Sequence, residues 1–229
     1  MVKNLLVFPD TKTLSWGQGG VRYTDSLGGV DFGLQYYTGF LRDPVFNADP
    51  TLLASTQHLA VTYNRYHQAG LDTAFVLADI NVRAEASWNQ TDDLAGDKAL
   101  VRNPFANATL GLDRTIAGIS FNVQALGTYT MNLDKATTAY DGQKGAKSFT
   151  GTGALQVAYK LWNDRLELSL AGSAAYPDLD WVVVPLVTVT PVDDVTLSLG
   201  GKLFGGDVNG QFGQYASKSF VELKAGYQF

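Results

Sequence analysis

The sequence predicts an all-β protein built from antiparallel strands of about ten residues each. Three observations predict this fold class. Apolar and polar residues alternate through most of the chain, clusters of turn-forming residues separate the alternating stretches, and every apolar run is too short for a transmembrane helix. The chain has 229 residues, 24 of them glycine, and no cysteine, which excludes disulfides, thiol catalysis and cysteine-bound metals.

The clearest alternation lies at the C-terminus, over residues 217–229. Counting back from Phe229, every second residue as far as Val221 is apolar, whereas the intervening residues include Glu222 and Lys224. Because side chains alternate across a strand, this segment has one apolar and one polar face. A strand that continues to a terminal aromatic residue is unusual in a soluble sheet, because chain ends are usually exposed and frayed.

This C-terminal stretch resembles the closing strand of bacterial outer-membrane β-barrels. In that family, a C-terminal phenylalanine with apolar residues at alternate preceding positions marks the barrel for insertion. The resemblance covers about the last ten residues and implies an antiparallel, up-and-down transmembrane β-barrel. It also implies a location in the outer membrane of a Gram-negative-type bacterium. The implied partners are the lipid bilayer and, through the C-terminal strand, the barrel-assembly machinery.

Alternation predicts about twelve strands in one domain that spans residues 1–229, with ten or fourteen as the alternative counts. The expected strands cover residues 2–8, 13–24, 30–41, 55–66, 79–90, 104–115, 118–132, 148–162, 166–176, 181–190, 195–205 and 217–229.

The lengths of the connections predict the topology. Short connections follow residues 24, 115, 162 and 190, and long ones follow residues 41, 90, 132 and 205. In outer-membrane barrels the short turns are periplasmic and the long loops extracellular, so the last strand is expected to end in the periplasm. Residues 2–8 are then needed as an upward first strand that completes an even number. Residues 1–10 lack the features of a signal peptide, so export would require a signal that precedes this sequence.

The two faces of the strands differ in composition, which favours a membrane barrel over a soluble barrel or sandwich. Charged side chains share one face and are expected, with a few aromatic ones, to line a lumen. The expected lumen-lining residues are Arg22, Tyr37, Arg83, Glu85, Lys160, Glu167, Lys202, Phe204, Glu222 and Lys224. Aromatic residues cluster at the ends of the apolar face, as in the interfacial girdles of such barrels. The expected girdle residues are Tyr63, Trp88, Tyr129, Tyr159, Tyr227 and Phe229.

The sequence offers little for catalysis or metal binding. His58 is expected to face inward from a strand, and His67 to lie in a turn. The family includes a phospholipase whose serine and histidine lie on the lipid-facing surface, separated by one residue, and His58 lacks that spacing. The segment that begins at Asp207 starts like a calcium loop but has Lys218 where an acid is required. No enzyme activity, metal or cofactor is therefore expected.

These patterns predict a pore for passive diffusion of small polar or charged solutes through a narrow lumen. Residues 67–79 break the alternation and are expected either to fold inward as a constriction or to form an extended turn or strand. The alternatives are a structural, adhesive or engineered scaffold barrel with an occluded lumen and, less favoured, an outer-membrane lipid hydrolase. The net charge of −5 argues against nucleic acid as a partner.

Overall fold

The computed structural model describes residues 5–47, 49–135, 142–143 and 145–228 and confirms the all-β, antiparallel prediction. The strands are β1 (Leu6–Val7), β2 (Gly19–Leu27), β3 (Val30–Phe40), β4 (Val45–Asn47), β5 (Leu59–Thr62), β6 (Arg65–Leu77), β7 (Ile80–Thr91), β8 (Phe105–Ile116), β9 (Ile119–Thr130), β10 (Phe149–Leu161), β11 (Leu166–Tyr176), β12 (Trp181–Val192), β13 (Val195–Gly205) and β14 (Phe220–Tyr227). The helices are α1 (Pro50–Thr56) and the 3₁₀ turns η2 (Leu14–Trp16), η3 (Leu133–Lys135) and η4 (Gly213–Lys218).

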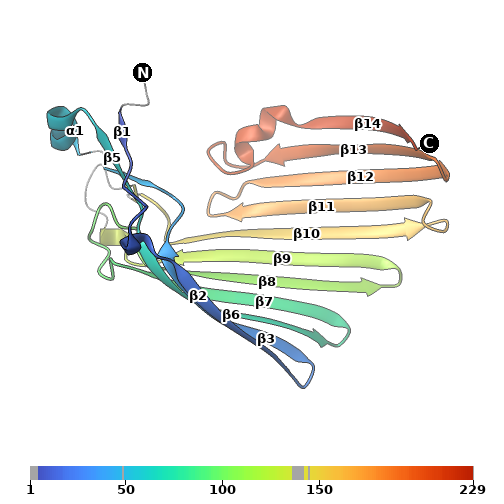
Figure 1. Cartoon of the computed structure of the whole chain (residues 1–229). Helices are drawn as coiled ribbons and strands as arrows, with labels where there is room; N and C mark the ends of the chain where they lie inside the picture. The colour runs from blue at the N-terminus through green and yellow to red at the C-terminus, as the bar shows by residue number, and fades with distance from the viewer. Residues whose placement is uncertain (1–4, 48, 136–141, 144, 229) are drawn as a thin grey trace. The chain divides into compact units, whose positions relative to one another are not determined.

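Eleven strands form one sheet in the order β14-β13-β12-β11-β10-β9-β8-β7-β6-β3-β2 (Figure 1). A separate three-stranded sheet has the order β1-β5-β4. None of the described helices is long and apolar enough to cross a bilayer. The strands of the large sheet are arranged almost in sequence order, as expected of an up-and-down topology.

The chain forms two compact units, each assembled from discontinuous segments. The first unit comprises residues 1–73, 85–108 and 128–149, and the second comprises residues 74–84, 109–127 and 150–229. The expectation of a single domain over the whole chain stays a prediction.

Several hairpins close with two-residue turns in which both residues have positive φ. Gly28 and Gly29 have φ angles of 60° and 84°, and Ala117 and Gly118 have φ angles of 50° and 80°. Positive φ at both central positions matches the right-handed twist of the flanking strands, which explains why such turns link neighbouring strands directly. Ala78 and Asp79 adopt the same conformation between β6 and β7, although that sequence carries neither glycine nor asparagine.

Strand pairing in the second unit places apolar and polar side chains of two adjacent rows on opposite faces. Residues directly opposite each other in an antiparallel pair share a face. From β10 to β14, one row of opposed residues is Tyr159, Leu168, Val187, Leu199 and Leu223. The adjacent row, on the other face, is Lys160, Glu167, Thr188, Ser198 and Lys224. These two adjacent rows are therefore amphipathic across five strands.

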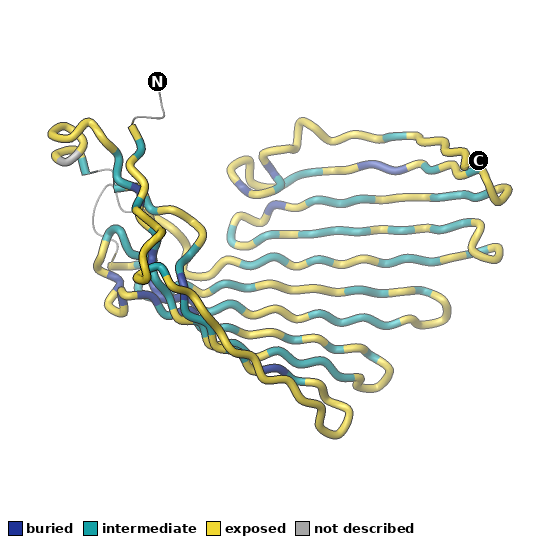
Figure 2. The backbone as a smooth tube through the Cα atoms, in the orientation of Figure 1, coloured by how far each residue is buried: buried dark blue, intermediate teal, exposed yellow. Residues whose placement is uncertain are grey.

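Burial is inverted relative to a soluble protein. Among the described residues, Val61 and Phe105 are the only non-proline apolar side chains that are buried. In contrast, Leu199 and Leu223 in the apolar row are 52% and 77% exposed, and Figure 2 shows buried backbone on β13 only at two glycines. A soluble domain of this size would bury such leucines in a packed core. The exposed apolar row matches a surface whose natural solvent is lipid.

The sequence prediction was wrong between residues 49 and 66. The strand expected over residues 55–66 is divided among α1, β5 and the start of β6. Of the alternatives for residues 67–79, the extended strand is the one observed, because these residues form most of β6 and the turn to β7. Helix α1 begins with Asp49, whose side chain accepts a hydrogen bond from Thr51 N, followed by Pro50 at the first helical position. This N-terminal capping pattern favours a helix over a strand.

The strand expected over residues 2–8 does not join the large sheet with its described part. Leu6 and Val7 pair in parallel with Leu59 and Ala60 of β5. Two other strands also begin later than expected, because η2 precedes β2 and η4 precedes β14. The expected total of about twelve strands is close to the eleven that the large sheet contains.

Candidate functional site

Each unit contains a cavity on its sheet. The first, here called the aromatic cavity, has a volume of about 950 Å³, and its lining includes the rings of Trp16, Tyr37, Tyr63 and Tyr66. The second cavity has a volume of about 470 Å³. Its lining includes Asn81, Arg83 and Asp113, and these three residues are here called the charged cluster. The two cavities differ in chemistry, so each is described separately.

Strand β3 supplies the first wall of the aromatic cavity. Gln35 and Tyr37 alternate with apolar residues, so both side chains lie on the polar face. The Tyr37 hydroxyl donates a hydrogen bond to Gln18 Oε1 at 2.6 Å. A Cβ atom at Gly39 would lie 2.3 Å from the Tyr37 hydroxyl oxygen, so glycine at this position makes room for the phenol.

Strand β6 supplies the facing wall, with Tyr66 and Gln68 on the same face. The Tyr66 ring lies 5.6 Å from the Tyr37 ring at an interplanar angle of 54°. Gln68 Nε2 donates a hydrogen bond of 3.1 Å to Asn89 Oδ1, and Asn89 is buried. The hydrogen bond fixes the Gln68 side chain against the neighbouring strand before any ligand arrives.

Trp16 reaches the cavity from the 3₁₀ turn η2. Its ring lies 4.2 Å from that of Phe40 and 6.1 Å from that of Tyr63, between centroids. Arg65 Nη1 donates to Ser15 O at 3.1 Å, and the Arg65 guanidinium lies 5.3 Å from the Phe40 ring centroid. These contacts hold the turn against the ends of β3 and β6.

The charged cluster forms where β7 and β8 lie side by side. Asp113 accepts a hydrogen bond from Asn81 Nδ2 at 2.6 Å and forms an ion pair with Arg83. Alternation places Arg83 and Glu85 on the same face of β7, but the ion-pair partner of Arg83 is Asp113 on β8. Asp113 lies on a neighbouring strand, and strand register cannot be read from the local sequence.

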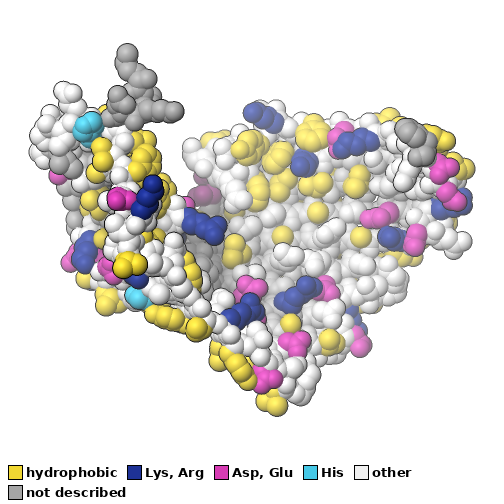
Figure 3. Space-filling view, viewed as in Figure 1, with side chains coloured by type: hydrophobic (Ala, Val, Ile, Leu, Met, Phe, Trp, Pro, Cys, Tyr) yellow, Lys and Arg dark blue, Asp and Glu magenta, His cyan; other side chains and the backbone are white. Residues whose placement is uncertain are grey.

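Other charges on the polar face are also paired. Arg22 Nη2 lies 2.9 Å from both carboxylate oxygens of Asp72, and Lys224 Nζ lies 2.7 Å from Glu222 Oε1. From the sequence, Glu222 and Lys224 were expected only to share the polar face. Figure 3 shows basic and acidic side chains lying beside one another, so charges of both signs are interspersed on this surface.

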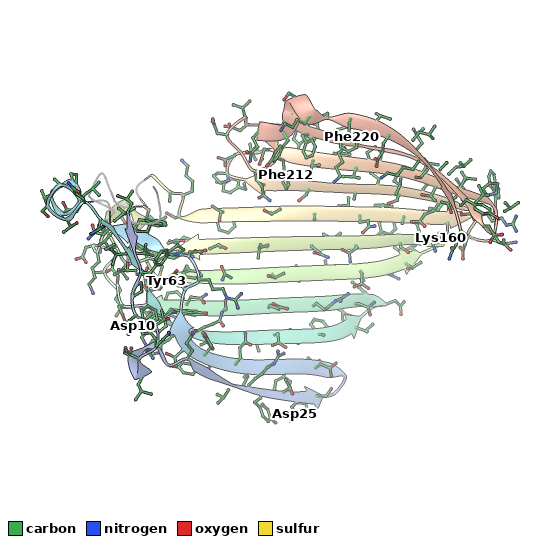
Figure 4. All side chains as sticks on the ribbon, turned by 45° about the horizontal axis from the view of Figure 1, so that its top comes forward. Asp10, Asp25, Tyr63, Lys160, Phe212 and Phe220 are labelled. Atoms are coloured by element: carbon green, nitrogen blue, oxygen red, sulfur yellow. The ribbon has the colours of Figure 1, made fainter. Side chains whose placement is uncertain are left out.

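The ten expected lumen residues all lie on strands, in the alternation phase that the sequence predicted. Lys160 and Glu167 oppose each other directly, and Figure 4 shows Lys160 at the end of β10. The polar face is interrupted on β12, where Val182 opposes Phe204 and Leu186 opposes Gly200. That this face lines a lumen stays a prediction.

The expected girdle residues occupy different settings. Trp88, Tyr129, Tyr159 and Tyr227 lie on strands, and Phe229 lies outside the described residues. Tyr63 lies in the link between β5 and β6 rather than in a strand, and its ring faces the aromatic cavity. Tyr63 therefore belongs to a candidate binding site, whereas the interfacial role of the other residues stays a prediction.

Both histidine assignments were wrong. His58 lies in the link between α1 and β5 instead of a strand, where its N–H donates to Thr56 Oγ1 at 3.2 Å. His67 lies in β6 instead of a turn, and its Nδ1 is 2.7 Å from the Tyr36 hydroxyl. Within the described part of the chain, no group of three or more acidic, histidine or cysteine residues is placed to hold a metal.

Buried carboxylates hold the backbone of two long loops through hydrogen bonds. The sequence did not predict this role for them. In the first unit, Asp93 accepts from the backbone N–H groups of Gly96 at 2.9 Å and Lys98 at 2.8 Å. In the second unit, Asp180 accepts from the N–H groups of Phe212 and Gly213. A carboxylate that binds several N–H groups organises a loop without any metal ion.

The loop of the first unit also carries a stacked arginine. The Arg102 guanidinium lies 4.0 Å from the Phe105 ring centroid and 3.8 Å from Asp43. Burial lowers the pKa of Arg102 from its ordinary value, and Asp43 opposes this shift. Arginine nevertheless keeps its charge, because its ordinary pKa is far above neutrality.

Sequence reasoning missed Trp16, Gln18 and Gln68 as site residues, together with the ion-pair partners Asp72 and Asp113. Gln68 and Asp72 share a face of β6 with Tyr66, at alternate positions. Their even spacing in the sequence could have shown that the three side chains lie on one face of a strand. Trp16 gave no such signal, because it lies in a 3₁₀ turn.

Neither a protein-family model nor a curated protein matches the sequence. Among solved structures, the chain is similar to the Salmonella typhi outer membrane phospholipase dimer with bound calcium, at 12% identity and a TM-score of 0.35, covering 91% of this chain and 76% of that one. It is also similar to outer membrane phospholipase A from Escherichia coli, at 11% identity and a TM-score of 0.35, covering 91% and 80% of the two chains. Likenesses this distant do not determine the activity of this chain.

Proposed function

We propose that the chain is a bacterial outer-membrane β-barrel that acts as a pore for passive diffusion of small polar or charged solutes. The observation that supports it is the pair of adjacent rows in the second unit. The row from Tyr159 to Leu223 is wholly apolar, and the row from Lys160 to Lys224 is wholly polar. A transmembrane barrel needs this arrangement, with apolar side chains toward lipid and polar ones toward water.

The polar face suits weak selectivity among small solutes. Arg22 is paired with Asp72, Arg83 with Asp113, and Lys224 with Glu222. Paired charges of both signs partly cancel each other's field, whereas a ring of one sign would reject one class of ion. The proposed pore therefore passes both cations and anions.

Single-channel recording tests the proposal. The full chain, folded in detergent and reconstituted in a planar bilayer, is expected to give stepwise conductance that carries both K⁺ and Cl⁻. Folding is checked first by heat-modifiable migration on a gel. Folded protein that gives no conductance would contradict the pore and leave a structural, adhesive or scaffold barrel.

Two further outcomes would replace the proposal. A chain that stays folded and monomeric in buffer without detergent is not a membrane barrel. Release of fatty acids from phospholipid vesicles by the folded protein would replace the pore by a lipid hydrolase, the activity that the phospholipases named above carry.

A further inference from the structure

We infer that the aromatic cavity is a binding site for a neutral saccharide. This inference rests on the proposed function, because the cavity is formed partly by polar-face residues of β3 and β6 that a diffusing solute would meet. Its volume of about 950 Å³ lies at the upper end of the range of small-molecule sites, which is about 300–1,000 Å³.

Aromatic rings provide the apolar part of the site. Trp16, Tyr37 and Tyr66 are half-buried and come from three segments, η2, β3 and β6. A sugar ring presents C–H groups on its faces and hydroxyl groups around its rim. Half-buried rings can cover the C–H face, and the tyrosine hydroxyls supply polar contacts at the edge.

Amides provide the polar part. Gln18, Gln35 and Gln68 line the same cavity, and each amide carries both donors and an acceptor. Sugar hydroxyls also donate and accept, so the two sets of groups complement each other. A lipid chain would offer no partner to the amide donors and acceptors that the contacts with Tyr37 and Asn89 leave over, which is unfavourable in a cavity from which water is displaced.

Charge argues for a neutral ligand. Among the described residues that line the cavity, Arg42 is the one ionised group, and its side chain is exposed. A charged solute would gain more from the charged cluster of the second unit, where Arg83 and Asp113 are present. The aromatic cavity therefore selects by shape and hydrogen bonding rather than by ion pairing.

The cavity is organised without ligand. Tyr37 is held by Gln18 and lies over Gly39, and a Cβ at Gly70 would lie 2.7 Å from Gln35 Nε2. Two glycines on the polar face thus leave space for the side chains that would contact the sugar. Side chains ordered in advance lose less entropy on binding.

Isothermal titration of the full chain with maltotriose tests the inference. Lauryldimethylamine oxide is the appropriate detergent, because its headgroup contains no sugar. Maltotriose is expected to bind, and Trp16→Ala or Tyr37→Ala to weaken binding about tenfold or more. Gly39→Ala, which removes no ring, is expected to weaken binding by displacing Tyr37. The matched control, Tyr129→Ala, removes an aromatic ring outside the cavity and should leave affinity unchanged.

Each other outcome overturns the inference in a recognisable way. Absence of maltotriose binding to folded, conducting protein would refute the saccharide site and leave the pore. Adenosine that binds more tightly than maltotriose, with the same dependence on Trp16, would assign the cavity to flat aromatic solutes. Equal affinity of all variants would place any binding elsewhere. Binding without conductance would instead refute the pore and keep the site.

Discussion

The aromatic cavity of the first unit and the charged cluster of the second are built from the same kind of strands but recognise solutes differently. The first unit brings Trp16 and Tyr63, from outside the large sheet, against β3 and β6. The second uses side chains of neighbouring strands and their turns, and its central groups, Arg83 and Asp113, form an ion pair. The difference teaches that segments outside the regular strands add rings to those of Tyr37 and Tyr66, whereas strand residues alone form the charged cluster.

The units also differ in how they bury polar groups. Of the six polar residues that are buried in the described part of the chain, Asp180 lies in the second unit and five lie in the first, namely Asn64, Asn89, Thr91, Asp93 and Asn103. Asn64 illustrates the pattern, because it donates to Leu100 O and accepts from Arg102 N. Hydrogen bonds of this kind stabilise irregular backbone that the large sheet does not hold.

The largest expected loss of stability tests whether the apolar row of the second unit lies against lipid. Leu223→Arg should lower the free energy of unfolding by about 2–4 kcal/mol, because a guanidinium on the apolar row would lie in mid-bilayer lipid. Urea titration in lipid vesicles measures this loss. Lys224→Leu, on the opposite face, is the matched control and should cost much less. Equal losses would show that the two faces do not have different solvents.

A smaller loss of stability is expected when the buried carboxylates of the loops are removed. Asp93→Ala leaves the N–H groups of Gly96 and Lys98 without their acceptor and should cost about 1–3 kcal/mol. Asp180→Ala should have a similar effect in the second unit. Limited proteolysis should then cut each loop faster only in its own variant. Faster cleavage of both loops in either variant would mean that the units do not hold their loops independently.

The smallest effect on stability is expected at the charged cluster. Asp113→Asn removes the partner of a largely exposed Arg83, so the free energy of unfolding should change little. The remaining positive charge should shift reversal potentials toward anion selectivity. Maltotriose affinity should not change. A weakened affinity would show that the charged cluster and the aromatic cavity are not separate sites.

Alternation predicted the regular hairpins well. The bounds of β11 and β13 were predicted without error, since clear turns flank both strands. Strand β6 was missed because Arg65 and His67 lie in its apolar phase and Val76 in its polar phase, which hides the period of two. Asp49 and Pro50 form an N-terminal capping pattern that is typical of a helix, but residues 55–66 were assigned to a strand because of their apolar alternation.

At the candidate sites, the sequence predicted which face of the sheet a side chain lies on. It did not predict which residue that side chain contacts. The period of two placed Arg83 and Lys160 on the polar face, because it depends only on neighbouring residues. The ion pair from Arg83 to Asp113 spans 30 positions and depends on register between strands. The contact of Trp16 with Tyr63 likewise depends on how a turn folds over strand ends.

Water accessibility of single cysteines tests the central claim most directly. The chain has no cysteine, so each variant carries one reporter. In lipid vesicles, Ser198→Cys and Lys224→Cys should react with a water-soluble maleimide. Leu199→Cys and Leu223→Cys should resist it and, once labelled with a fluorophore before reconstitution, be quenched by brominated lipid. Equal maleimide reactivity at all four positions would contradict a sheet with one face toward lipid and the other toward water.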